Sequence, residues 1–97
     1  MSELLAIFGP TDTDSELLTE IVRQRPGRVT VLIEGADPDW ATGDGEIARA
    51  MRERMAALLT LIERRTGATV VGTGGDRAQF DGVRFDRELC SRMPVAA

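Results

Sequence analysis

The sequence predicts one α/β domain over residues 1–97, of the β-α-β-α-β kind, with a three-stranded parallel sheet. Three short apolar segments alternate with two segments of helical periodicity. The composition, 42% hydrophobic and 29% charged, is typical of a globular chain. A chain of 97 residues is long enough for one hydrophobic core and too short for two.

The first strand and helix are predicted at the start of the chain. Residues 4–8 form a short apolar run that Gly9 and Pro10 close, which favours a buried strand. Thr13 and Glu16 have the spacing of a capping box, in which each side chain satisfies a free backbone amide at a helix start. The helical pattern then continues to residue 25, before a Pro-Gly stop.

The second strand and helix follow. Residues 29–33 are rich in β-branched residues and largely apolar, which favours a strand covered on both faces. Residues 34–45 form an acidic loop that is long for an ordinary connection. Residues 46–65 have the strongest helical periodicity of the chain. Their apolar stripe consists of Ile47, Met51, Met55, Leu58 and Ile62. The second half of this helix is apolar over more than one face, so we expect a second surface to pack there.

The third strand is predicted at residues 68–71 and runs into a glycine-rich segment. This completes a small Rossmann-like unit, with strand order 3-2-1 or 2-1-3. Residues 80–85 fit a short edge strand, because apolar and polar residues alternate from Val83 to Asp86, and residues 87–93 fit a short helix; both interpretations stay open.

The composition excludes several classes of function. A net charge of −4 argues against nucleic acid as a partner. All twelve basic residues are arginine, and histidine and lysine are absent. A Walker-type phosphate loop, a histidine-activated nucleophile and a zinc site are therefore not expected. No apolar run approaches the roughly 18 residues of a membrane span. A single cysteine, Cys90, cannot form an internal disulfide, which agrees with a cytoplasmic protein.

Residues 9–16 read Gly-Pro-Thr-Asp-Thr-Asp-Ser-Glu and resemble the universal stress proteins, whose first strand ends in Pro-Thr-Asp before a serine-bearing helix start. The resemblance covers roughly residues 3–80 and corresponds to the first half of that fold. It implies a site for ATP or AMP, in which Asp12, next to Thr11, reaches the adenine. Ile33, at the end of the second strand, would line the adenine pocket.

Residues 71–76 read Val-Gly-Thr-Gly-Gly-Asp and resemble the phosphate loop of the same family, with Gly72 and Gly75 in the places of its first two glycines. The family has a further glycine with serine or threonine about ten residues on, where this chain has Phe85 and Asp86. On a second alignment the segment is the family's third strand, and the phosphate-binding half is absent. A third interpretation is that these glycines only permit a tight turn.

Other candidate residues have ordinary structural interpretations beside functional ones. The carboxylate oxygens of Asp37, Asp39 and Asp44 are of the kind that binds magnesium or calcium. Their spacing does not match a calcium loop, so we predict no metal site. Trp40 is either a lid over a pocket or an anchor on the rim of the sheet. Cys90 is either filler or a redox-sensitive thiol.

We therefore predict a small stress-response or regulatory protein that binds an adenine nucleotide and has no catalytic residues. The alternatives are an interaction module without a nucleotide and an enzyme that uses carboxylates alone. We also predict a homodimer. In a 3-2-1 sheet both right-handed crossovers lie on one side, so the other side would need a cover, of which residues 80–93 could supply a part and a second copy the rest. A 2-1-3 order would place one helix on each side and weaken this argument.

Overall fold

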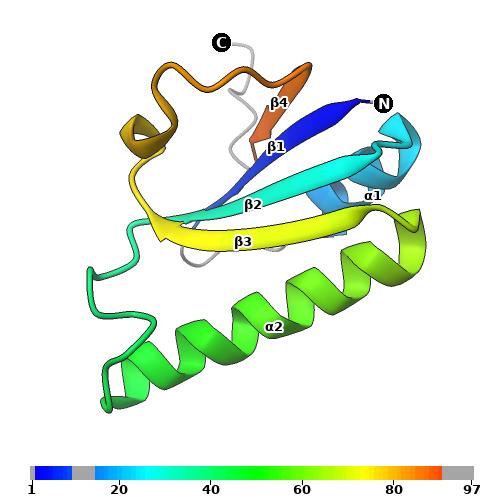
Figure 1. The fold of residues 1–97 in the computed structure, drawn as a ribbon. Helices are drawn as coiled ribbons and strands as arrows, with labels where there is room; N and C mark the ends of the chain where they lie inside the picture. Colours follow the sequence, from blue (N-terminus) through cyan, green and yellow to red (C-terminus); the bar gives the residue numbers. More distant parts are fainter. Residues whose placement is uncertain (1, 10–14, 91–97) are drawn as a thin grey trace, which may run out of the picture.

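The computed structural model describes residues 2–9 and 15–90 and shows an α/β fold with a four-stranded, wholly parallel sheet (Figure 1). The elements follow in the order β1 (Glu3–Phe8), α1 (Ser15–Gln24), β2 (Arg28–Glu34), α2 (Glu46–Thr66), β3 (Thr69–Gly75), η1 (Arg77–Phe80) and β4 (Arg87–Cys90). The strand order is β3-β2-β1-β4. Of the two strand orders that the sequence left open, the structure has 3-2-1. The prediction of three strands is wrong, because β4 adds a fourth strand beside β1.

Both α-helices cover the same face of the sheet, as two right-handed crossovers in one direction require. The main core lies between them and the sheet (Figure 1). β1 contributes Leu4, Ala6 and Phe8 to this core, and β2 contributes the alternate residues from Val29 to Ile33. The predicted capping residue Thr13 lies outside the described residues.

The opposite face is covered by the connection from β3 to β4. Leu5 and Leu32 are fully buried there, and Phe80 and Phe85 pack against them. The two rings meet edge to face, with centroids 5.7 Å apart. The cover is therefore internal to the chain over β1 and the middle of β2.

The last part of the described chain also differs from both sequence-based interpretations. Residues 81–86 are turn and coil because Phe85 must reach the sheet face. Residues 87–90 form a strand and not a helix, since their backbone pairs with β1 from Leu4 to Ile7. The Asp86 carboxylate accepts a hydrogen bond from the Glu3 amide at 2.6 Å, and the Asp86 amide donates to the Glu3 carbonyl at 2.8 Å.

α2 is longer than the sheet it covers. Its 21 residues span about 31 Å, whereas a seven-residue strand spans about 23 Å. The helix ends at Gly67, which has a left-handed φ of 71° and donates its amide to the Glu63 carbonyl. The first turn overhangs the carboxyl ends of the strands, so Ile47 is 77% exposed and does not join the predicted stripe. Among the described residues, no helix is long and apolar enough to cross a membrane.

Candidate functional site

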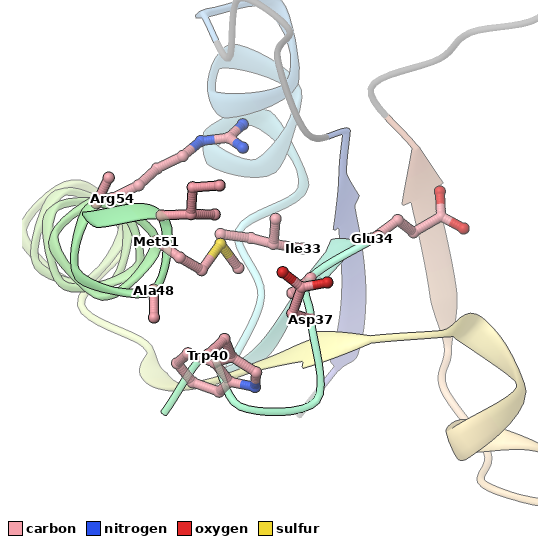
Figure 2. Close-up of a pocket in the computed structure, with 11 residues that line it drawn as sticks. Ile33, Glu34, Asp37, Trp40, Ala48, Met51 and Arg54 are labelled. Atoms are coloured by element: carbon pink, nitrogen blue, oxygen red, sulfur yellow. The ribbon is translucent and has the colours of Figure 1, made fainter. Parts of the chain in front are cut away.

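A pocket of about 310 Å³ lies under the overhanging start of α2, at the carboxyl end of β2. Its lining comes from the last residues of β2, the loop that follows and the first half of α2 (Figure 2). Ligands of open α/β sheets bind at the carboxyl ends of parallel strands, because the loops there diverge and leave a crevice. The volume is at the lower end of the range for small-molecule pockets.

The inner walls of this pocket are apolar. Ile33 forms part of the lining from the end of β2, and Met51 points its thioether toward it from α2 (Figure 2). Trp40 closes the side nearest the loop (Figure 2). Its indole also packs on β3, because a Cβ at Gly74 would lie 3.2 Å from the Trp40 Nε1 atom. Trp40 is thus both an anchor on the sheet and a wall of the pocket.

Two arginines of α2 fix the surroundings of the pocket. The Arg52 guanidinium donates to the carbonyls of Trp40 at 2.9 Å and Gly43 at 2.8 Å, which holds the loop on the helix. Arg54 lines the pocket and donates to the Gly9 carbonyl, at the end of β1, at 2.8 Å. Hydrogen bonds from an ionised donor are stronger than neutral ones, so the loop is held in place although it is long.

The basic and acidic side chains around the pocket lie at different ends of it. Arg54 supplies positive charge on the side of β1, and Asp37 supplies a carboxylate where the loop leaves β2, whereas the Glu34 carboxylate points away from Met51 and α2 (Figure 2). Asp37 is exposed and Glu34 is partly exposed, so water screens both. A ligand that carries many negative charges would meet repulsion at this end.

A second, more open hollow lies on the other side of Trp40. It has a volume of about 610 Å³, and its lining includes Glu34, Gly75, Asp76 and Gln79. Gly75 has a φ of 137°, which L side chains rarely adopt, and a Cβ there would lie 3.0 Å from the Gln79 Nε2 atom. The Asp76 side chain accepts from the Ala78 amide at 3.0 Å and caps η1. One oxygen of this exposed carboxylate therefore stabilises the turn.

The predicted nucleotide-binding residues fall in different places. Thr11 and Asp12 lie outside the described residues. Ile33 lines the pocket. Gly75 lines the second hollow. Gly72 lies inside β3 beneath α2, where a Cβ would overlap the Met55 Sδ atom. The glycine at position 72 therefore permits close packing of helix and strand.

Sequence reasoning missed the contribution of α2 to the pocket. Ala50, Met51 and Arg54 line it together because residues three and four apart share one face of a helix. The signal was present in the length of the predicted helix, which exceeds the length of the strands. Only the structure shows which end of the helix overhangs.

The remaining candidates are not brought together in the described ranges 2–9 and 15–90. Asp37, Asp39 and Asp44 are all exposed, and these ranges contain no cluster of three or more metal-ligating side chains. Cys90 is half-buried and packs beside the small core formed by Leu5, Ile7 and Leu32. The position of its thiol favours a packing role.

No protein-family model, no curated protein and no solved structure matches this chain. The fold and the pocket therefore rest on the geometry of the chain itself. The resemblance of residues 9–16 to the universal stress proteins stays a hypothesis.

Proposed function

We propose that this chain is a small regulatory protein that binds an adenine nucleotide in the pocket at the carboxyl end of β2. The observation that carries the proposal is the position of this pocket, with Ile33 in its lining as the resemblance to the universal stress proteins implies. A role in a stress response follows from the same resemblance. Binding without turnover suits a regulatory protein and a chain that has no histidine or lysine.

Adenine suits the shape and chemistry of the pocket. The base is flat and has an apolar face, and Ile33, Met51 and Trp40 offer apolar and aromatic surface for it. Thioether sulfur also makes favourable contacts with aromatic rings. The Asp37 carboxylate is an acceptor suited to the exocyclic amino group of the base. By resemblance, Asp12 is a second acceptor.

The charges favour a monophosphate over a triphosphate. Among the described residues that line the pocket, Arg54 contributes the cationic group and Asp37 contributes a carboxylate. AMP carries about two negative charges and ATP about four, so repulsion rises with each added phosphate. We therefore expect AMP to bind at least as tightly as ATP in the absence of a divalent cation.

The test uses the single tryptophan as a reporter. The chain has one tryptophan and no tyrosine, so its fluorescence reports on the wall of the pocket. Titration with AMP at micromolar concentrations is expected to change this fluorescence with saturation. Ala50→Phe places a ring into the pocket and is expected to weaken binding at least tenfold. Ala57→Phe, two turns further along the same face of α2, is the matched control, since both alanines are exposed.

A comparison of two ligands distinguishes a phosphate contact of Arg54 from a role in the shape of the pocket. Arg54→Gln is expected to lower the affinity for AMP about tenfold, because a charge-assisted hydrogen bond contributes about 1.5 to 3 kcal/mol. The affinity for adenosine, which has no phosphate, is expected to stay within about twofold. Loss of both affinities alike would assign Arg54 to the shape of the pocket. No saturation with AMP, ATP or adenosine would contradict the proposal.

The second candidate function is a protein-interaction module without a nucleotide. The observation that favours it is an edge of the sheet, β3, whose strand carries no charged side chain from Thr69 to Gly75. Calorimetry with AMP distinguishes the two, because an interaction module gives no heat with the nucleotide.

A further inference from the structure

We infer that two copies of this chain associate through the β3 edge, in antiparallel register, to form one continuous eight-stranded sheet. The inference goes beyond the nucleotide proposal and does not depend on it. It begins from the backbone of β3, which pairs with β2 and with no other strand in the described part of the chain.

The backbone groups that face outward can be identified from the hydrogen bonds at both ends of β3. The Thr69 amide donates to the Gly27 carbonyl at 3.2 Å, and the Gly75 carbonyl accepts from the Gly35 amide at 3.1 Å. Thr69 and Gly75 therefore point their backbone groups toward β2. Alternate residues of a parallel strand point the opposite way. The amides and carbonyls of Val70, Gly72 and Gly74 consequently point away from the sheet, where another strand can bind them.

Within its own seven residues, β3 lacks the features by which strands at an edge prevent the addition of another strand. Such features are charged side chains, proline, bulges and very short strands. β3 has seven residues, and none of them is charged or proline. Val71, on the face away from α2, is 41% exposed. An uncharged strand of this length with an exposed valine is a template for β-pairing.

The charges around β3 favour a second copy in antiparallel register. Arg64 and Arg65, in the last turn of α2, are exposed just before β3, and Asp76 is exposed just after it. Antiparallel pairing of two identical strands brings the start of one beside the end of the other, so these arginines approach the partner's Asp76. Parallel pairing would bring like charges together, which is unfavourable. A two-fold axis also closes the assembly at two copies.

The register that pairs the whole of β3 has its two-fold axis at Gly72. In this register Val70, Gly72 and Gly74 exchange hydrogen bonds with the second copy, which matches the outward-facing groups. Val71 then lies opposite Thr73 of the second copy in a pair without hydrogen bonds, the closer kind of antiparallel pair. Two β-branched side chains cover each other there. Both α2 helices then lie on the same face of the combined sheet. Ala56, which is exposed on α2, belongs to this helical layer in both copies.

The first test is sedimentation equilibrium of the full chain from 1 to 200 µM, with far-UV circular dichroism to check folding. The wild type is expected near twice its mass of 10.5 kDa. Val71→Lys is expected to raise the dissociation constant of the dimer at least tenfold, because a charge on an edge strand opposes pairing. Val83→Lys is the matched control, since Val83 is 51% exposed and lies outside the strands. A monomeric wild type, larger open-ended assemblies or equal dimerisation of both variants would overturn the inference.

The second test keeps the inference falsifiable if Val71→Lys fails to fold. In a Cys90→Ser background, Val71→Cys with Thr73→Cys places two thiols opposite each other across the proposed interface. Oxidation under mild conditions is expected to give a covalent dimer that reductant splits. Val83→Cys in the same background is expected to stay monomeric. Failure of the double variant to cross-link above the level of Val83→Cys would count against the register. The same assays with and without AMP show whether the dimer needs the nucleotide.

Discussion

The two edges of the sheet differ in how they are protected. β3 has seven uncharged residues, whereas β4 has four, of which Arg87 and Glu88 are charged and exposed. Glu88 also accepts a hydrogen bond from Arg77 at 2.8 Å, which ties η1 across the face of the sheet and raises the pKa of the Arg77 guanidinium. Short length and charge are the usual means of blocking an edge. These features oppose the addition of a strand at the β4 edge, whereas no strand of the described residues pairs with the outer edge of β3.

The same two edges are held to the core by different means. β3 is held on the helix side, where Gly72 and Gly74 let Met55, Met51 and Trp40 approach the backbone. β4 is held on the opposite side, where the connection from η1 brings Phe80 and Phe85 onto the sheet. An edge built from glycines gains close helix packing and has little side chain left to shield its rim. This contrast gives three tests in mutant stability.

The largest effect is expected at the β3 edge. Gly72→Val forces Met55 and Leu59 to move, since even a Cβ would overlap the Met55 Sδ atom and lie 3.0 Å from Leu59. Overpacking of a tight site costs about 3 kcal/mol at the upper end of its usual range. We expect that loss in the free energy of unfolding, measured by urea denaturation.

The matched control for this test is Gly45→Ala. Gly45 has a φ of −69°, and no heavy atom lies within 4 Å of the position that an alanine Cβ would take. The change is therefore expected to alter stability by less than about 1 kcal/mol. Equal losses at positions 72 and 45 would show that α2 does not pack on Gly72 as described.

An intermediate effect is expected on the side of β4. Phe85→Ala removes one ring of the edge-to-face pair and uncovers Leu5 and Leu32. Full burial of a phenylalanine would give a loss of about 3 to 5 kcal/mol, but Phe85 is only partly buried, so we expect about 2 kcal/mol. Phe85→Leu, which keeps an apolar cover, is expected to lose about half as much. An unchanged midpoint of urea denaturation for Phe85→Ala would mean that the cover of this face of the sheet does not contribute to stability.

The sequence predicts the elements well where local pattern decides them. The strands at residues 4–8 and 29–33 are apolar on both faces, and both are central and buried in the sheet. The helix predicted at residues 46–65 ends within one residue of its expected end, because Gly67 is a strong stop signal.

The sequence predicts less well where tertiary contacts decide. Residues 87–90 have no strong strand pattern, and they form β4 because β1 has a free edge beside them. Gly72 has the same local pattern whether it binds a phosphate or lies beneath a helix, and the position of Met55 distinguishes these cases. Ile33, which only the family resemblance named, lines the pocket, but its contact with a nucleotide stays a prediction. Met51 and Arg54 could not be predicted without knowledge of how α2 overhangs the sheet.

The smallest effect is expected where β4 begins. The Asp86 carboxylate accepts a hydrogen bond of 2.6 Å from the Glu3 amide, so it anchors the start of β4 to the start of β1. Asp86→Ala is expected to lower the free energy of unfolding by about 1 kcal/mol, since the site is exposed and water replaces part of the bond. Asp86→Asn retains an acceptor oxygen and is expected to lose less than half of that. Because the Asp86 amide still donates to the Glu3 carbonyl in both variants, β4 stays paired. Hydrogen exchange of the β4 amides measures this directly: faster exchange in Asp86→Ala than in Asp86→Asn is expected, and identical rates would show that the carboxylate does not hold this edge.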